Sequence, residues 1–403
     1  MTLTTTVLEH AQAGRFDRIS EMFAPELRPH VAPDTLRASW DAAVARLGRV
    51  TAIGAEEHGQ GPGVLMAHTP VQFEHGTLSV TVATNGEWIV GIQLDRPEQD
   101  EWASPPYADK QKFTEEDITL SGDGRTVPGT LTMPSTATPH AAVVLLSGSG
   151  PHDRDETIGL NKPFKDLAWG LASRGIAVLR AEKVSFTHGK DLPSTFTLYD
   201  EYLPHALAAV ALLRERLPEA AVYVAGHSLG GTIAPRVAHE APVDGLILIA
   251  AGAQPMHWST VRQMRYLASV QPLPQSAIDT LATQAARIDG DLTLDTPDSE
   301  LPFGTPAAYW LSVRDYHPVA EAARLTVPIL LVNGGRDYQV TVADDLALWR
   351  EGLAGHANVT IEVFAAGNHM LAAGEGPATP AEYQAPHHVA PEIIDLIARW
   401  IGA

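Results

Sequence analysis

A serine between small residues stands where an apolar run changes into a helical pattern. Residues 225–231 read Ala-Gly-His-Ser-Leu-Gly-Gly, which places Ser228 between Gly226 and Gly230. A sharp strand-to-helix turn needs small flanking residues, because the backbone there passes close to itself. A serine on such a turn can attack a carbonyl carbon, and the dipole of the following helix favours the negative charge that develops. We therefore predict that Ser228 is the nucleophile of an acyl-transfer reaction; the alternative is an ordinary glycine-rich turn.

Two later loops carry the residues that a nucleophilic serine requires. Asp337 follows the apolar run 327–333, and His369 follows the run 359–364. Serine, acid and histidine occur in this chain order in the α/β-hydrolase fold, where the histidine removes the serine proton and the acid orients the imidazole. We predict Asp337 as the acid and His369 as the general base; the alternative for Asp337 is a cap of the helix that begins near Val342. Rival candidates lie inside a helical pattern or just before the last one: Asp344, Asp345, His387 and His388.

Acyl transfer also requires two N–H groups that bind the developing oxyanion. One is expected from the residue after the nucleophile, here Leu229, and the second from the loop after the third strand of the fold. That loop is Ser147–Pro151 and is rich in glycine. We predict the main-chain amide of Ser149 as the second donor, with the Gly148 amide as the alternative; an ordinary glycine-rich turn is the competing interpretation.

The next five residues, His152–Glu156, combine a histidine, an arginine and three carboxylates. No second cluster at metal-ligand spacing accompanies them, so we predict an ion-pair network around Arg154 that braces the loop, and no metal. Gly148-x-Gly150 lacks the Lys-Ser/Thr of a phosphate-binding loop, and we expect no cofactor.

Composition excludes several classes of function. The chain has 403 residues, a formal net charge of -20 and no cysteine. Such acidity disfavours nucleic acid as a partner, although it is more often a solubility feature, and the lack of cysteine excludes disulfides and thiolate chemistry. Residues 1–16 show no signal-peptide pattern, and no apolar run is long enough to span a membrane. We expect a cytoplasmic protein with no membrane or nucleic-acid partner, and a homodimer is an open alternative.

From Lys112 onward, apolar strand-like runs alternate with helical patterns, which is typical of a mostly parallel sheet covered on both faces. An antiparallel pair at 117–121 and 129–133 opens this region. The later strands are expected at 141–146, 176–180, 221–225, 245–250, 328–333 and 358–364, and the helices at 163–173, 197–216, 229–240, 342–352 and 391–401. The stretch 255–323 is mostly helical without a clear strand, and we predict that it forms a cap over the crevice at the carboxyl ends of the strands.

The first part of the chain has a different pattern. Helical periodicity at 3–13 and 33–47 precedes short alternating runs separated by His75-Gly76 and Asn85-Gly86, which predicts a small α+β domain over residues 1–96. Residues 97–111 contain three prolines and no apolar period, and they are predicted to be a linker to a hydrolase domain at 112–403.

Several segments resemble a bacterial carboxylesterase family related to the serine-aminopeptidase-like α/β hydrolases. The resemblance covers Lys112 to the C-terminus and rests on Gly-Ser-Gly-Pro at 148–151, Asp-Arg-Asp-Glu at 153–156, Asn-Lys-Pro-Phe at 161–164, the run 171–180, the serine motif, and Gly-Arg-Asp-Tyr-Gln-Val at 335–340. It implies an eight-stranded, mostly parallel sheet and hydrolysis of esters with short acyl chains. This sequence departs from the family at residues 180–185, where only the lysine of Tyr-Asp-Lys-Arg-Gly remains, and Ser147 stands where many α/β hydrolases have histidine.

The N-terminal part is similar to an uncharacterised domain that precedes such hydrolases and is thought to form a nuclear-transport-factor-like cone. The cues are Ala-Gly-Arg-Phe-Asp at 13–17, Met-Phe at 22–23 and Leu-Arg-Ala-Ser-Trp at 36–40. The similarity implies a pocketed or dimerising module.

These observations favour a serine hydrolase that cleaves esters of small or medium acyl groups through an acyl-enzyme. A thioesterase, lactonase, peptidase or acyltransferase would use the same three residues, and a non-catalytic binding protein is the remote alternative. Large side chains of the cap are expected to line the substrate site, or else to form the core of the cap: Trp258, Met264, Tyr266, Tyr309 and Trp310.

Overall fold

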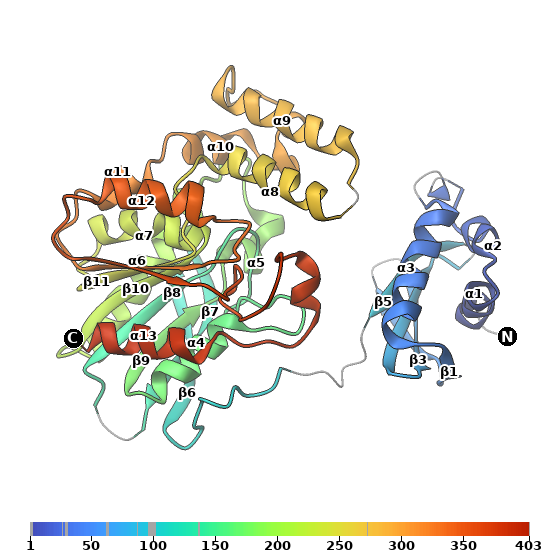
Figure 1. Cartoon of the computed structure of the whole chain (residues 1–403), viewed down its shortest axis with the longest axis horizontal. Coiled ribbons are helices and arrows are strands. Elements are labelled where there is room, and N and C mark those ends of the chain that lie inside the picture. Colours follow the sequence, from blue (N-terminus) through green and yellow to red (C-terminus); the bar gives the residue numbers. More distant parts are fainter. Residues whose placement is uncertain are drawn as a thin grey trace. The chain divides into compact units, whose positions relative to one another are not determined.

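The computed structural model describes residues 3–25, 27–28, 31–61, 64–86, 88–95, 102–135, 138–271 and 273–402. The chain divides into two compact units, Met1–Glu101 and Trp102–Ala403 (Figure 1). Each unit has its own apolar core, and the two are described in turn.

The first unit is a small α+β domain, as predicted. Its helices are α1 (Leu3–Gln12), α2 (Phe16–Glu21) and α3 (Pro33–Leu47), and its strands are β1 (Val50–Ile53), β2 (Glu57–Gly61), β3 (Val64–Phe73), β4 (Gly76–Thr84) and β5 (Ile89–Asp95). The strands form one antiparallel sheet with β3 paired to β4 and β4 to β5. The resemblance to a cone-like domain stays a prediction.

The second unit contains an eight-stranded sheet in the order β13-β12-β11-β10-β8-β9-β7-β6. The strands are β6 (Phe113–Gly122), β7 (Arg125–Pro134), β8 (Ala141–Leu146), β9 (Ile176–Ala181), β10 (Ala221–His227), β11 (Gly245–Ile249), β12 (Ile329–Gly334) and β13 (Val359–Phe364). The six strands from β8 to β13 run parallel to one another, whereas β6 pairs antiparallel with β7 and β7 with β9. This is the fold of an α/β hydrolase, with the predicted antiparallel opening.

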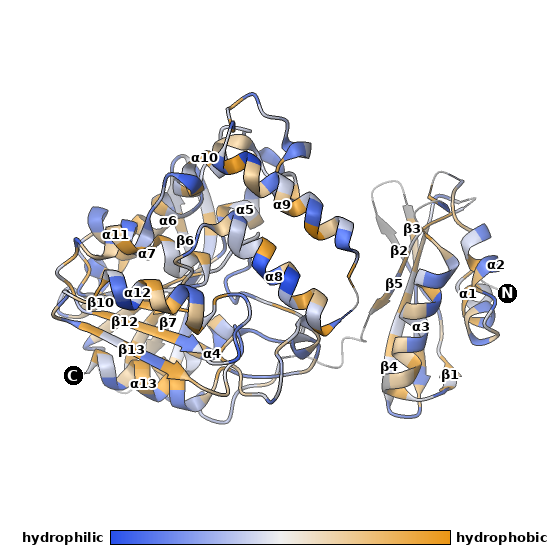
Figure 2. Cartoon of the chain, turned by 45° about the horizontal axis from the view of Figure 1, so that its top comes forward, coloured by the Kyte–Doolittle hydropathy of each residue, from blue (hydrophilic) through white to orange (hydrophobic). Residues whose placement is uncertain are grey.

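Helices cover both faces of this sheet because its central strands are apolar on both sides. In β8 every residue is buried. Ala142, Val144 and Leu146 face a core shared with α6 (Leu198–Arg216), α7 (Leu229–Glu240) and α12 (Ala347–Gly352). The alternate residues of β8 face a second core shared with α4 (Pro163–Ala172) and α13 (Pro391–Ile401). Figure 2 shows the apolar colouring concentrated in the strands and on α13.

The predicted cap lies between β11 and β12. It consists of α8 (Met256–Val270), α9 (Gln275–Asp289), α10 (Ala307–Arg314) and α11 (Pro318–Ala322), with a longer connection over residues 290–306 between α9 and α10 that contains two short 3₁₀ turns (Figure 1). Helices α8 and α9 pack on each other through a small cluster of their own that includes Val261, Leu281 and Ala285. No strand occurs in the described residues of the cap, in agreement with the sequence pattern.

Part of the predicted linker is instead packed on the second unit. The Trp102 indole donates a hydrogen bond to Asp166 of α4 at 2.9 Å, and the Tyr107 hydroxyl donates to the Val389 carbonyl at 2.8 Å. Proline and polar composition suggested a loose connection, but these two aromatic side chains pack against α4 and α13. The expectation of a linker is therefore wrong for residues 102–111, and residues 97–101 lie outside the described residues.

Candidate active site

Ser228 occupies a strained turn between β10 and α7. Its backbone has φ 52° and ψ -119°, a conformation that non-glycine residues rarely adopt. A Cβ on Gly226 would lie 2.2 Å from the Gly230 carbonyl oxygen, and a Cβ on Gly230 would lie 2.1 Å from that of Leu146. Both distances are shorter than non-bonded atoms tolerate, so glycine is required at each position for this turn to form.

Asp337 and His369 meet at the neighbouring edge of the sheet. They follow β12 and β13, which pair in parallel with Gly334 opposite Phe364, so the two loops emerge side by side. His369 Nδ1 lies 2.7 Å from Asp337 Oδ2, and both residues are buried. Asp337 Oδ1 also accepts hydrogen bonds from the main-chain amides of Gln339 and Val340 at 2.8 and 3.0 Å.

This geometry determines the proton position on His369. Because the carboxylate of Asp337 can only accept, Nδ1 carries the hydrogen of the neutral ring, which leaves the lone pair of Nε2 available as a base. Among the described residues, the Ser228 hydroxyl makes no hydrogen bond to His369. Catalytic hydrogen bonds are often long in ligand-free structures and shorten when substrate binds.

The rival acids and histidines have other roles. Thr341, not Asp337, caps the helical turn that begins at Val342, because its side chain accepts a hydrogen bond from the Asp344 amide. The fully buried Asp345 accepts from the amides of Ala253 and Gln254, which shapes the loop at the start of the cap. His388 pairs with Asp166 of α4 at 3.1 Å.

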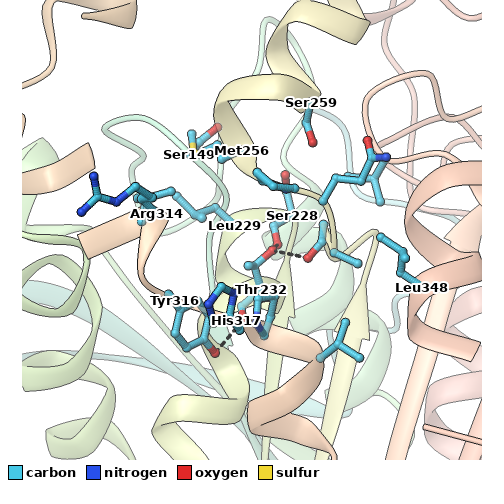
Figure 3. Close-up of a pocket in the computed structure, with 18 of the residues that line it drawn as sticks. Ser149, Ser228, Leu229, Thr232, Met256, Ser259, Arg314, Tyr316, His317 and Leu348 are labelled. Carbon is cyan, nitrogen blue, oxygen red and sulfur yellow. Dashed lines mark hydrogen bonds between the residues drawn. The ribbon is translucent and has the colours of Figure 1, made fainter. Parts of the chain in front are cut away.

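The loop after β8 favours Ser149 over Gly148 as the second oxyanion donor. The Gly148 amide already donates to Glu156 Oε1 at 2.6 Å. Ser149 lines the same cavity as Ser228 and Leu229, as Figure 3 shows. A Cβ on Gly148 would lie 3.2 Å from Ser228 Cβ, so the loop approaches the serine closely only because residue 148 is glycine.

His227 points away from the nucleophile, as expected, but into a buried pair that the sequence analysis missed. Its Nδ1 lies 3.0 Å from Glu156 Oε1 and its Nε2 lies 3.0 Å from the His369 carbonyl oxygen. Both partners only accept, so both ring nitrogens carry hydrogen and the imidazole is cationic. Burial alone would lower the pKa of His227, but the negative charge of Glu156 outweighs burial, and the pKa of His227 is raised. Burial alone would raise the pKa of Glu156, but the positive charge of His227 outweighs burial, and the pKa of Glu156 is lowered.

Arg154 forms the expected ion-pair network next to this loop. Its guanidinium contacts Asp117 at 2.9 Å and Glu182 at 3.2 Å, and it donates to the Gly129 carbonyl. These contacts tie the 152–156 segment to β6 and β7. The ion-pair interpretation of this segment is confirmed.

A cavity of about 670 Å³ opens at Ser228, with Ser149 and Leu229 in its wall. Its lining is mostly apolar and comes from the sheet edge and from the cap, including Leu198, Met256, Val313, Val319, Val340 and Leu348. The Tyr316 hydroxyl donates to the Thr232 carbonyl at 2.9 Å and fixes one wall (Figure 3). A pocket of this size and polarity suits a small organic molecule.

The lining predicted from sequence needs correction. None of the following five belongs to the described lining of this cavity: Trp258, Met264, Tyr266, Tyr309 and Trp310. The Trp258 indole donates to Asp289 of α9, the Tyr309 hydroxyl donates to Glu201, and Trp310 is only 1% exposed. The polar atoms of Trp258 and Tyr309 are therefore bonded within the cap and its base, whereas Trp310 is buried there and its Nε1 has no hydrogen-bond partner among the described residues.

The other two are also engaged elsewhere. The Tyr266 ring stacks on Tyr338 with centroids 5.0 Å apart, and its hydroxyl donates to the Ala378 carbonyl. Met264 packs in the small apolar cluster of α8 and α9. The sequence offered these side chains either as lining of the substrate site or as core of the cap, and the structure places both, half-buried, away from the cavity.

No group of three or more histidine or acidic side chains is arranged to hold a metal ion within the part of the chain that the structure describes. No described helix combines the length and the apolarity needed to cross a bilayer.

The chain is similar to known hydrolases over most of its length. A family model described as serine aminopeptidase, S33, matches residues 137–375. The esterase EstD of Thermotoga maritima is 36% identical over 395 residues, which span 98% of this chain and 93% of that protein. Among solved structures, an esterase of Pyrococcus furiosus has a TM-score of 0.46 and 18% identity over 72% of this chain and 92% of its own. A proline iminopeptidase of Mycobacterium smegmatis has a TM-score of 0.46 and 17% identity, over 71% and 98%.

Proposed function

The chain belongs to the serine aminopeptidase S33 family of α/β hydrolases, and we propose that it hydrolyses carboxylic esters with Ser228 as nucleophile, Asp337 as acid and His369 as base. The observation that carries the proposal is the hydrogen-bonded pair of Asp337 and His369, in loops that emerge at the same sheet edge as the strained serine turn. The 36% identity to an esterase over 98% of the chain favours an ester over the other acyl substrates.

In the acylation step His369 Nε2 takes the proton of the Ser228 hydroxyl, and Oγ forms a bond to the ester carbonyl carbon. The carbonyl electrons move to oxygen, and the amides of Leu229 and Ser149 donate hydrogen bonds to that oxyanion. When the tetrahedral intermediate collapses, the C–O bond to the alcohol breaks and His369 returns its proton to the leaving oxygen. The products of this step are a free alcohol and an acyl-serine.

Deacylation repeats the sequence with water. His369 accepts a proton from water, whose oxygen attacks the acyl carbon; collapse then breaks the bond to Oγ, and Ser228 regains its proton from His369. Throughout both steps Asp337 holds the Nδ1 hydrogen of His369 and stabilises the transient imidazolium, while the two amides from Gln339 and Val340 hold the carboxylate in place.

The cavity suits acyl groups of small to medium size. Its volume of about 670 Å³ and mostly apolar wall accommodate an alkyl chain, while the side chains of Arg314, His317 and Glu351 also border the cavity. We infer that the acyl or alcohol portion is held mainly by apolar contact, and that discrimination between chain lengths is gradual, at about 0.8 kcal/mol per buried methylene.

A substrate panel tests the proposal. The purified protein and Ser228→Ala are assayed on p-nitrophenyl esters from acetate to octanoate, a thioester, a lactone and an aminoacyl p-nitroanilide. The proposal predicts that an ester has the highest kcat/KM and that Ser228→Ala abolishes its turnover. A highest kcat/KM on the aminoacyl amide would identify a peptidase instead, and undiminished turnover by Ser228→Ala would refute the assignment of Ser228 as nucleophile.

A cytoplasmic location and a homodimer remain predictions from the sequence alone.

A further inference from the structure

A buried cluster lies behind the loop that carries the second oxyanion donor. The Gly148 carbonyl oxygen accepts a hydrogen bond from Lys183 Nζ at 2.8 Å, and the single hydrogen of the Tyr202 hydroxyl is shared between this oxygen, at 2.9 Å, and the Ser147 carbonyl oxygen. The same hydroxyl lies 2.8 Å from the Ser147 carbonyl oxygen. Lys183 and Tyr202 are 6% and 4% exposed, so these contacts are made out of reach of bulk water.

The contacts of Lys183 match its charged form. Its Nζ has three acceptors: the Gly148 carbonyl, the Tyr202 hydroxyl at 2.9 Å and Glu201 Oε1 at 3.2 Å. An ammonium group has three hydrogens and satisfies all of them, whereas a neutral amine has two. Burial lowers the pKa of Lys183, and the adjacent carboxylate of Glu201 opposes that change by favouring the ammonium.

The peptide bond joins this cluster to the catalytic site. The Gly148 carbonyl and the Ser149 N–H belong to one planar peptide unit, and none of the described peptide bonds is cis. In a trans peptide these two groups point in opposite directions. Fixing the carbonyl against Lys183 and Tyr202 therefore directs the Ser149 N–H to the other side of the unit, and Ser149 borders the cavity next to Ser228.

We propose that Lys183 and Tyr202 are positioning residues of the oxyanion hole: they fix and polarise the Gly148–Ser149 peptide so that the Ser149 N–H is directed at the developing oxyanion. This proposal rests on the proposed ester hydrolysis. The ammonium withdraws electron density through the carbonyl and makes the N–H a stronger donor, because linked hydrogen bonds polarise one another. Glu156 holds the preceding peptide through the Gly148 amide, so residue 148 is fixed on both sides.

The same cluster offers a matched control. Tyr309 donates to Glu201 Oε2, as Ser185 does to Oε1, but these side chains make no hydrogen bond to the main chain of the loop. Tyr202→Phe and Tyr309→Phe each remove one buried hydroxyl from the cluster, yet only Tyr202→Phe removes a donor to the Gly148 carbonyl. A purely structural role predicts similar effects of the two substitutions.

The test compares an ester with the thionoester in which sulfur replaces the carbonyl oxygen. Sulfur accepts hydrogen bonds weakly, so the oxyanion hole contributes less to thionoester turnover. Complete loss of one donor typically costs about 10²–10³ in kcat, and weakening one should cost about tenfold. We expect Tyr202→Phe and Lys183→Met to lower kcat for the oxygen ester about tenfold or more, with KM changed less than about twofold and the thionoester slowed less.

The control variant and the wild-type protein distinguish a positioning role from a purely structural one. Tyr309→Phe should keep kcat for both esters within about twofold. An unchanged kcat in Tyr202→Phe, equal slowing of both esters, or the same selective loss in Tyr309→Phe would overturn the proposal. Lys183→Met leaves Glu201 without its cation, and if that variant fails to fold, Tyr202→Phe decides alone. If Ser228→Ala still hydrolyses the ester, the proposed function is wrong. If Ser228→Ala is inactive but Tyr202→Phe and Lys183→Met behave like wild type, the proposed ester hydrolysis is supported and the positioning role is wrong.

Discussion

His227 and Glu156, 71 residues apart in the chain, form a buried ion pair at 3.0 Å next to the strained turn at Ser228. The pair connects two parts of the site. Glu156 also accepts the Gly148 amide of the oxyanion loop, and His227 also donates to the main-chain carbonyl of His369. Loss of the charge on either residue would therefore loosen both loops at once.

The pair predicts a specific pH dependence of stability. Because Glu156 raises the pKa of His227 above its ordinary 6.5, the histidine contributes stability that is complete below pH 6.5 and is lost as the pH rises through the raised pKa. Because His227 lowers the pKa of Glu156 below 4.5, that contribution is present above pH 4.5 and is lost as the pH falls through the lowered value. The difference in Tm between wild type and His227→Gln should be largest at pH 4.5–6.5 and shrink at higher pH.

A matched variant separates this effect from general changes with pH. His140 is exposed, so His140→Gln should give a Tm difference that is small and constant over the same range. A Tm difference for His227→Gln that stays constant, or that grows above pH 6.5, would contradict the buried ion pair.

Asp337→Asn should strongly reduce turnover while preserving the fold. The amide nitrogen can donate to His369 Nδ1 and thereby place the ring hydrogen on Nε2, where it cannot accept the serine proton. We expect kcat on p-nitrophenyl butyrate to fall by up to about 10⁴. Asp291→Asn, whose side chain is 83% exposed, is the control and should retain wild-type kcat. A kcat within tenfold of wild type for Asp337→Asn would assign the acid elsewhere.

Gly148→Ala should impair catalysis through crowding. The added methyl would lie 3.1 Å from Glu156 Oε1 and 3.2 Å from Ser228 Cβ, so the oxyanion loop must move away from the serine. Displacing one donor should lower kcat by about 10²–10³ with a smaller change in KM. Steady-state kinetics would measure this, and a kcat equal to wild type would show that the loop is not held in contact with the nucleophile.

Gly230→Ala should destabilise the whole second unit. Its Cβ would lie 2.1 Å from the Leu146 carbonyl oxygen and 2.6 Å from that of Ser147, and backbone atoms cannot move aside without displacing β8. We expect a loss of about 3 kcal/mol or more in the free energy of unfolding, measured by urea denaturation. At Gly189 a Cβ meets nothing within 4 Å, so Gly189→Ala should be nearly neutral; equal effects of the two substitutions would contradict the strained turn.

The proposed triad could be predicted from local patterns that are visible in the sequence alone. Each of Ser228, Asp337 and His369 follows an apolar run, and the carboxyl ends of parallel strands meet at one edge of a sheet, so motif and chain order predict these three residues as the triad. The structure adds the 2.7 Å contact between Asp337 and His369 and the strained backbone of Ser228.

Other parts of the site depend on distant partners and were not predictable in the same way. The sequence left open whether Tyr266 and Trp310 line the cavity or form the core of the cap, because it does not show on which face of the cap the cavity lies. Trp102 looks like part of a linker until Asp166 of α4 is seen to accept its N–H. The departure at residues 180–185 did draw attention to Lys183, yet its role requires Tyr202 and Gly148 from two other segments.

Covalent labelling of the nucleophile tests the central claim most directly. The protein is treated with a fluorophosphonate, which reacts with an activated serine, and the adduct is located by intact mass and peptide mapping in wild type, Ser228→Ala and His369→Gln. We predict one adduct per chain on Ser228, no labelling of Ser228→Ala, and much slower labelling of His369→Gln. An adduct on a different residue, or a folded wild-type protein that does not react, would contradict the account.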